Sequence, residues 1–335
     1  MFLNQIFEFS MVLNEKKFQE VLSISYVKAD EWDEEKEEYL DNSMAEKGII
    51  IRYRDSQYKK KIVLIYNLQW KQVDETSKVN KSVGNLDKCI REYFSYKYTL
   101  NDFKLSGMLL ANDIDVGEQE TVNEYLKVFR RIGKVKNFTV ADLGNLEKKQ
   151  YFYLRGNSNS IMFLAYNMGA VIQEYHKEMG TGGKKARSAV KETKGILRLE
   201  VRLDKPKAIR MYAASDDSAE GMKELLKERQ NIFLDVLRQV IPFGDYYKKD
   251  KAFEIIQERV KDKVLRRKML RLAALIPEKK SLYLAQKSMS CNRDMDKIMD
   301  GFAKINLSPV TLSKRQDVNW LKNIYVYIFR TVDKV

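Results

Sequence analysis

The sequence is poor in the side chains that most often hold a catalytic metal, because its 335 residues include one histidine and two cysteines. The single histidine, His176, cannot build a paired-histidine metal site, and its helix-like surroundings favour a surface position. Cys89 and Cys291 lie far apart, so we expect reduced thiols and neither a disulfide nor a zinc site. A metal in this protein would therefore be a hard cation, Mg²⁺ or Mn²⁺, held by carboxylates.

Three further features are missing from the sequence. It has no apolar run long enough to span a membrane, and no basic segment precedes an apolar stretch at its start. We therefore predict a cytoplasmic protein with no membrane partner. The glycine-rich segment GTGGKK at 180–185 has the wrong spacing for a phosphate-binding Walker loop.

Positive charge is abundant. Lysine and arginine number 61 against 47 aspartates and glutamates, which gives a formal net charge of +14. This excess favours a polyanionic partner, with nucleic acid first and an anionic membrane second. The aromatic content of 11% indicates a folded chain and argues against a disordered basic tail.

The first two thirds of the chain predict strands interleaved with helices. Alternating apolar residues predict strands at 1–14, 48–54, 60–68, 103–116, 151–155, 161–167 and 196–203. Helical periodicity predicts helices at 14–22, 86–98, 120–132 and 169–179. The acidic run at 29–45 predicts a solvated helix or loop. This pattern, with some strands joined as hairpins, predicts an α+β domain on an antiparallel sheet over residues 1–215.

The last third of the chain carries helical periodicity and loses the strand signals. Helices are expected at 218–241, 251–275, 294–305 and 318–329. We therefore predict an all-α C-terminal domain over residues 216–335.

The strand at 196–203 carries the strongest chemical signal. Alternate side chains of a strand share a face, so Arg198, Glu200 and Arg202 point one way while the leucines and the valine between them point into the core. A carboxylate between two arginines suits phosphate chemistry, because arginines grip phosphates and an acid holds a divalent ion. Tyr166, at the end of a neighbouring apolar run, is either a nucleophile or an aromatic packed between sheet and helix.

Asp113 and Asp115 are two residues apart and therefore share a strand face. They either complete an acidic metal-binding cluster with Glu200 or close the strand in a turn.

Two basic segments are candidate DNA contacts. The glycine-rich stretch 180–195 contains Lys184, Lys185 and Arg187, and is either a mobile loop that closes over a phosphate or a flexible connector. Residues 294–329 resemble a helix-turn-helix in which Ser313 and Gln316 form a capping box. A second helix there would place Lys314 and Arg315 in its first turn against DNA; the alternative is a purely structural hairpin.

Several segments together resemble rolling-circle replication initiation proteins of plasmids and integrative elements in Gram-positive bacteria, the Rep trans type. The matching segments are 103–117, 151–168, 195–203, 280–289 and 305–325. The resemblance implies an RRM-like or Rep-type nuclease sheet domain that binds an origin and nicks one strand through a tyrosine with a divalent metal. It makes Tyr166 the implied nucleophile and Glu200, Asp113 and Asp115 the implied metal ligands.

The sequence departs from the family pattern at two places. Gly107-Met108-Leu109 stands where an Arg-x-Asp sequence is expected, and Tyr166-Asn167-Met168 lacks the lysine that often follows the tyrosine. A lost acid weakens a hard-cation site, and a lost lysine removes a phosphate contact.

Three functions therefore stay open at this point. The first is a DNA nicking-joining endonuclease acting on duplex and single-stranded origin DNA, with a homodimer and a host helicase as predicted partners. The second is a non-catalytic DNA-binding protein, an inactive relative or a copy-number regulator. The third is an RNA-binding protein that uses Tyr151, Phe152 and Tyr153 on an RRM-like sheet.

Overall fold

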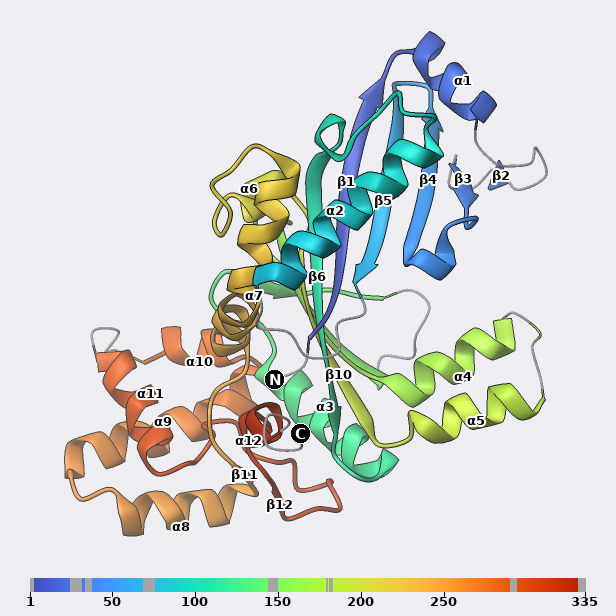
Figure 1. Cartoon of the computed structure of the whole chain (residues 1–335). Coiled ribbons are helices and arrows are strands. Elements are labelled where there is room, and N and C mark those ends of the chain that lie inside the picture. The colour runs from blue at the N-terminus through green and yellow to red at the C-terminus, as the bar shows by residue number, and fades with distance from the viewer. Residues whose placement is uncertain are drawn as a thin grey trace.

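The computed structural model describes residues 3–24, 32–33, 38–68, 76–143, 150–178, 180, 183–289 and 294–330. They form a mixed α+β fold, with one large antiparallel sheet in the N-terminal part and helices in the C-terminal part (Figure 1). The predicted α+β class is thereby confirmed, and the RRM-like or Rep-type assignment of the sheet stays a prediction.

The large sheet has ten strands in the order β2-β3-β4-β5-β1-β6-β10-β9-β8-β7, and neighbouring strands are antiparallel. Its strands are β1 (Asn4–Leu13), β2 (Trp32–Asp33), β3 (Glu38–Asp41), β4 (Ile49–Ser56), β5 (Lys59–Leu68), β6 (Lys104–Asp115), β7 (Phe138–Val140), β8 (Tyr151–Gly156), β9 (Ile161–Asn167) and β10 (Ile196–Leu203). A separate two-stranded ribbon pairs β11 (Tyr246–Tyr247) with β12 (Trp320–Leu321).

The helices of the first two thirds of the chain are α1 (Glu15–Ile24), α2 (Thr76–Tyr93), α3 (Gln119–Ile132), α4 (Met168–Glu178), α5 (Lys184–Glu192) and α6 (Pro206–Ile209). Those that follow are α7 (Ser218–Val240), α8 (Lys249–Arg259), α9 (Lys263–Lys279), α10 (Leu282–Lys287), α11 (Met295–Lys304) and α12 (Ile324–Arg330). Short 3₁₀ turns lie at Ala45–Lys47 and Leu100–Asp102. Within the described residues, no helix is both long and apolar enough to cross a membrane.

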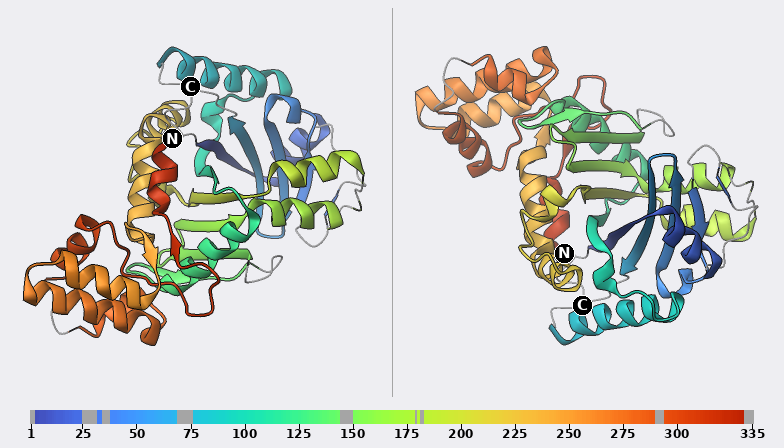
Figure 2. Two further views of the ribbon diagram at one scale, coloured as in Figure 1. Left: turned by 90° about the horizontal axis from the view of Figure 1, so that it is seen from below. Right: turned by 90° about the horizontal axis from the view of Figure 1, so that it is seen from above.

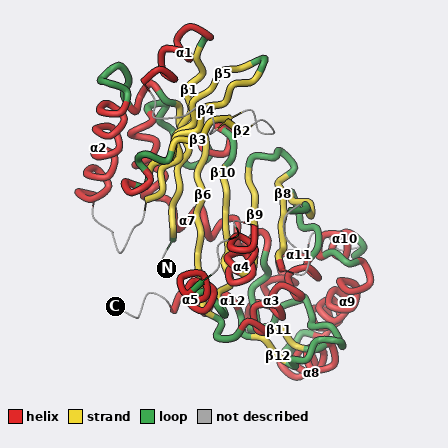
Figure 3. The backbone as a smooth tube through the Cα atoms, turned by 90° about the vertical axis from the view of Figure 1, so that its right-hand side faces the viewer, coloured by secondary structure: helices red, strands yellow, loops and turns green. Residues whose placement is uncertain are grey.

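The two faces of the sheet differ in what covers them. Alternate strand residues such as Phe7, Tyr53 and Leu199 are fully buried in one core against α2, α3 and α7, as strand periodicity requires. Figure 2 shows α7 and α12 on one side of the sheet and the paired helices α4 and α5 on the other. We call the second side the open face; α4 and α5 project beside it from the ends of β9 and β10 (Figure 3).

The helices after residue 216 share their core with the sheet. One hydrophobic cluster includes both Leu3 and Ile328, and α7 and α12 contact β6. The predicted boundary near 215 falls just before α7, and independent folding of 216–335 stays a prediction.

Several predicted bounds differ from the structure. The acidic run at 29–45 contains the edge strand β3, in which Glu38 and Asp41 are buried. The helix expected at 86–98 is α2, which begins ten residues earlier, at Thr76. The single helix expected at 251–275 is two helices, because the chain leaves helical geometry at Val260.

A glycine at the end of α3 lies directly against the backbone that precedes α10. Gly133 ends α3 with φ of +59°, and a Cβ placed there would lie 2.3 Å from the carbonyl oxygen of Lys280. The next carbonyl, that of Lys134, accepts hydrogen bonds from Ser281 Oγ at 2.8 Å and from the Tyr283 amide at 3.2 Å. The start of α10 is therefore docked on this turn by backbone contacts that leave no space for a side chain.

We predict that Gly133→Ala lowers the free energy of unfolding by about 3 kcal/mol, because alanine costs about 1–2 kcal/mol at positive φ and also meets the Lys280 backbone. Gly180→Ala is the matched control, since Gly180 has the same φ of +59° with open space around it. Denaturant unfolding of the full chain measures both. Equal losses in the two variants would show that the docking contact adds nothing.

Candidate functional site

The register of three neighbouring strands brings the predicted residues together on the open face. Arg198 of β10 lies opposite Tyr166 of β9 on one side and opposite Asp113 of β6 on the other. Glu200 follows two residues later on the same face, and Arg202 two residues after that. We call Tyr166, Glu200, Arg198, Arg202 and Asp113 the tyrosine centre.

The tyrosine centre is held by a chain of short hydrogen bonds. The Tyr166 hydroxyl donates to Glu200 Oε1 at 2.6 Å, and Arg202 Nη2 donates to Glu200 Oε2 at 2.8 Å. Arg198 donates to Asp113 through Nε at 2.5 Å and Nη2 at 2.6 Å, a two-pronged ion pair. Glu200 and Asp113 therefore each have an arginine partner, and the phenol of Tyr166 is hydrogen-bonded to Glu200.

Burial sets the electrostatics of the tyrosine centre. Glu200 is only 3% exposed and Tyr166 only 8% exposed. Burial, and then the neighbouring Glu200 charge, raise the pKa of the Tyr166 phenol, while Arg198 acts in the opposite direction. Burial opposes the charged form of Arg198, yet its bonds to Asp113 raise the pKa of this guanidinium. The resting centre thus holds a protonated phenol that donates its hydrogen bond to the Glu200 carboxyl group.

An apolar wall surrounds the phenol. Tyr151, Tyr153 and Leu164 form a cluster with Tyr166 on the open face, and Met168 and Val171 from the start of α4 pack against it. The ring of Tyr166 packs between sheet and helix, as one of the two interpretations expected, while its hydroxyl reaches the carboxylate of Glu200. The role of Tyr166 as a nucleophile stays a prediction. The packing restricts water around the phenolic oxygen.

The two aspartates of β6 have different roles in the structure. Asp113 belongs to the tyrosine centre, whereas Asp115 Oδ1 accepts a hydrogen bond from the Gly117 amide at 2.8 Å. Asp115 therefore closes the strand in a turn, which was the alternative interpretation of this residue.

The acids do not fit a bound cation in their present arrangement. Within the residues that the structure describes, no group of three or more histidine, cysteine, aspartate or glutamate side chains lies together so that it could hold a metal. Both Glu200 oxygens and both Asp113 oxygens already accept hydrogen bonds from Tyr166, Arg202 or Arg198. Binding of Mg²⁺ or Mn²⁺ stays a prediction, and we route no chemical step through a metal.

The basic segment 183–194 is a helix with its flanks, and not the loop that its glycines suggested. Lys184 and Arg187 are exposed residues of α5. The backbone of Lys185 belongs to the same helix. Arg187 lines a cavity of about 660 Å³ between α4 and α5, together with His176 and Lys191.

That cavity is separate from the tyrosine centre. The α4 residues that line it, Gly169, Gln173 and His176, share one side of the helix, whereas Met168 and Val171 face Tyr166 from the other side. The structure therefore does not bring Arg187 together with the tyrosine centre.

The helix-turn-helix predicted at 294–329 is wrong, because the structure contains its first helix, α11, but no helix that begins at Ser313. Residues 313–319 form a turn, and α12 begins only at Ile324 after the short strand β12. Lys314 and Arg315 are exposed in that turn. The Ser313 amide does donate to Gln316 Oε1 at 2.8 Å, but this bond closes a turn and does not cap a helix.

Two site residues were missed from the sequence. Arg155 of β8 donates to the Tyr153 hydroxyl through Nε at 3.3 Å and Nη2 at 3.2 Å, and Asn4 Nδ2 donates to Asp113 Oδ2 at 3.4 Å. The alternation of Tyr151, Tyr153 and Arg155 along one strand is a signal that would have placed the arginine on the open face.

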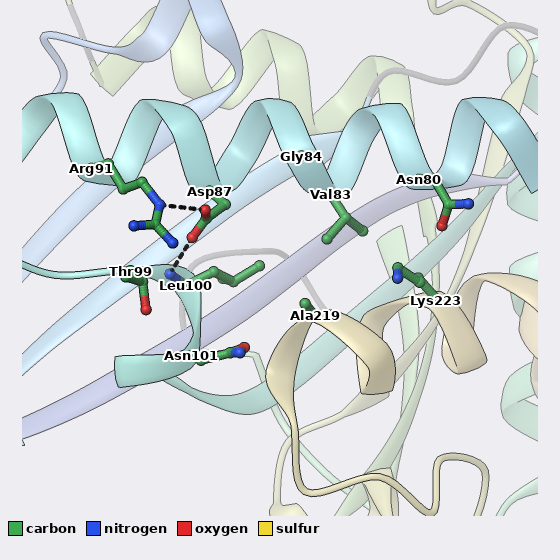
Figure 4. Close-up of a pocket in the computed structure, with 10 residues that line it drawn as sticks. All are labelled: Asn80, Val83, Gly84, Asp87, Arg91, Thr99, Leu100, Asn101, Ala219 and Lys223. Carbon is green, nitrogen blue, oxygen red and sulfur yellow. Dashed lines mark hydrogen bonds and ion pairs between the residues drawn. The ribbon is translucent and has the colours of Figure 1, made fainter. Parts of the chain in front are cut away.

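A different concave region lies on the helix side of the sheet. A cavity of about 380 Å³ opens where α2 meets the turn at Leu100 and the start of α7 (Figure 4). Asp87 accepts hydrogen bonds there from the Leu100 amide at 2.8 Å and from Arg91 Nε at 2.6 Å. Its charged side chain is therefore occupied in joining α2 to the chain before β6, and we assign this region a structural role.

Comparison with known proteins gives no relative for this chain: no family model matches the sequence, and neither a curated protein nor a solved structure is similar to it.

We predict that Glu200→Gln lowers the pKa of Tyr166 toward the ordinary tyrosine value, because the charge and hydrogen bond of Glu200 raise it while burial remains. The phenol should then ionise at lower pH than in the wild type. A pH titration followed by ¹³C NMR of labelled tyrosine, with Tyr166→Phe to assign the signal, measures the change. Asp115→Asn is the control, and an unchanged or higher pKa in Glu200→Gln would contradict the electrostatic assignment.

Proposed function

We propose that this chain is a DNA-processing protein of the replication-initiator type, which binds a DNA strand on the open face and cleaves it through Tyr166. The observation that carries the proposal is the 2.6 Å hydrogen bond from the Tyr166 hydroxyl to Glu200, with Arg198 and Arg202 beside it. A nucleophile, an adjacent base and cations suited to a phosphate are the parts that a phosphoryl transfer requires.

In the proposed reaction, a backbone phosphate binds at Arg198 and Arg202, and these arginines exchange part of their carboxylate contacts for phosphate oxygens. The Tyr166 oxygen attacks phosphorus while its proton passes to Glu200. The bond to the 3′ oxygen breaks, this oxygen takes a proton from solvent and leaves as a 3′ hydroxyl, and the 5′ phosphate stays on Tyr166 as a phosphotyrosine. One ester replaces another, so rejoining needs no ATP. Tyr166 is already within hydrogen-bond distance of its base, which is the geometric requirement for general base catalysis.

A second candidate function has its own support. Both acids are paired with arginines and the Tyr166 ring is packed in an apolar cluster, which also suits a protein that binds DNA without cutting it. In that case the sheet would act in an RRM-like way, displaying side chains on one face while helices cover the other. RNA binding on the same face, an origin sequence, a homodimer and a host helicase stay predictions.

We predict that Tyr166→Phe abolishes a covalent protein–DNA adduct and that Glu200→Gln slows its formation about 10²–10⁴-fold, the usual contribution of a general base. The full chain is incubated with a supercoiled plasmid that carries its own gene and flanking DNA. Nicked plasmid and protein-linked DNA are then resolved after denaturation.

The same assay separates the alternatives. An adduct that survives in Tyr166→Phe would overturn the assignment of the nucleophile. No adduct with the wild type, together with salt-dependent DNA binding, would favour the non-catalytic function. Competition by single-stranded RNA tests the RNA alternative, and chelation of divalent ions before the reaction tests the predicted metal.

A further inference from the structure

The hairpin of β4 and β5 concentrates positive charge on the open face, several strands away from the tyrosine centre. Arg54 lies directly opposite Lys61, and both alternate with core residues such as Tyr53 and Ile62. Arg52 and Lys59 stand two residues away on the same face of the same strands. We call these four residues the hairpin cations.

Within the described part of the chain, nearby acids neutralise the hairpin cations only in part. Glu38 accepts ion pairs from Arg52 Nε at 3.4 Å and Arg54 Nε at 3.3 Å, so one carboxylate serves two arginines. Asp55 and Glu15 pair instead with Lys60, which points to the other side of β5. Among the residues that the structure describes, the hairpin cations therefore outnumber the acids that pair with them.

This arrangement is unfavourable for the protein alone. Like charges directly opposite on neighbouring strands destabilise a sheet. Burial lowers the pKa of Lys61, and the charges of Arg54, Lys59 and Arg52 lower it further, while the charge of Glu8 acts in the opposite direction. A polyanion bound across the hairpin would relieve this repulsion.

An exposed aromatic side chain lies beside the hairpin cations. Tyr58 occupies the turn between β4 and β5, next to Lys59, and is 92% exposed. Cations that follow a nucleic acid backbone together with aromatic rings for base stacking are the usual means of binding single strands. The combination favours a single strand as the occupant, because bases in a duplex are already stacked on one another.

Arg202 of the tyrosine centre is within reach of a strand bound at the hairpin. Lys61 on β5 and Arg202 on β10 are three strand spacings apart, or about 14 Å. Lys61 pairs with Val12 of β1, whereas Arg202 pairs with Leu109 of β6, which in turn pairs with Ile6 of β1. Val12 and Ile6 are six residues apart on β1, so the two cations are also offset by about 20 Å along the strands. A path on the order of 25 Å spans several nucleotides.

We propose that the β4–β5 hairpin is a second anchor for single-stranded DNA, in which the hairpin cations bind backbone phosphates and Tyr58 stacks on a base. The inference rests on the proposed function, because it assigns the far end of the same strand that the tyrosine centre binds. It names a binding site in the N-terminal strands that the sequence patterns left without a role.

The test measures binding of a labelled oligothymidylate of about 20 nucleotides, longer than the sites of roughly 4–16 nucleotides typical of single-strand-binding folds. Arg54→Gln/Lys61→Gln should reduce the slope of log affinity against log salt by about 1.4, because each single-strand phosphate contact contributes about 0.7. Tyr58→Ala should weaken binding about tenfold through lost stacking, whereas Tyr58→Phe should bind as the wild type does.

The matched control is Lys81→Gln/Lys88→Gln. It removes the same charge from exposed positions of α2, on the covered side of the same strands, and should leave the salt slope unchanged. The thermal midpoint of Lys61→Gln alone should equal or exceed that of the wild type, since this variant removes the charge opposite Arg54 and leaves the ion pair of Arg54 with Glu38 in place. A lower midpoint would contradict the repulsion on which the argument depends.

The outcomes separate this inference from the proposed function. If the wild type binds no single strand, the proposed function fails. If it binds and the hairpin variants behave as the α2 control does, only the second anchor is overturned. A loss seen with duplex DNA and not with the single strand would overturn the assignment of the occupant.

Discussion

The buried carboxylate of Glu200 constrains the rest of the candidate site. A carboxyl group at 3% exposure requires hydrogen-bond partners that replace water, and Tyr166 and Arg202 supply them from β9 and β10. The strand that carries it is also among the most buried of the sheet, since Leu197, Leu199, Val201 and Leu203 are fully covered by the core. If β10 slipped by one residue against its neighbours, its apolar side chains would turn to the open face and Arg198, Glu200 and Arg202 would turn into the core. Packing of the apolar side chains and pairing of the polar ones therefore favour the same register.

The tyrosine centre and the hairpin cations differ in how far their positive charge is paired with carboxylates, and this difference bears on where a strand would bind first. In the tyrosine centre each arginine has its own carboxylate, so little net charge is offered to an approaching strand. At the hairpin, Arg52 and Arg54 share the carboxylate of Glu38, so among the described residues the cations there outnumber their ion-paired acids. We therefore expect long-range attraction of a strand to be stronger at the hairpin than at the tyrosine centre. On the proposed function, a strand would be held there first, and its phosphates would then compete with Asp113 and Glu200 for Arg198 and Arg202 at high local concentration.

Sequence patterns predicted those parts of the site that depend on short-range order. Strand alternation predicts that Arg198, Glu200 and Arg202 share one face, and the apolar run ending at Tyr166 predicts the strand β9; the structure confirms both. The pairing of Arg198 with Asp113 was not predicted, because it depends on the register of two strands that lie 85 residues apart. Local patterns do not determine such a register.

The predicted helix-turn-helix failed for a related reason. The spacing of Ser313 and Gln316 allows one side-chain bond to a backbone amide, and this bond closes a turn as readily as it caps a helix. What decides between them is distant in the sequence: Gln316 is buried and donates to Glu124 Oε2 at 2.7 Å, across 192 residues. Likewise the glycines before Lys184 suggested a loop, while contacts between α4 and α5 support a helix there.

The raised pKa of Tyr166 does not by itself oppose its use as a nucleophile. Burial and the Glu200 charge raise this pKa because loss of the proton to solvent would leave two negative charges in one poorly hydrated space. Transfer of the proton to Glu200 is a different event, since the phenol gains a negative charge as the carboxylate loses one, and the total charge of the pair is unchanged. The same burial that suppresses ionisation in the resting protein therefore leaves the internal transfer open. On the proposed function, the phenolate would attack only when a phosphate is bound at Arg198, and otherwise the proton would return from Glu200 to Tyr166. Cleavage would therefore require a bound strand.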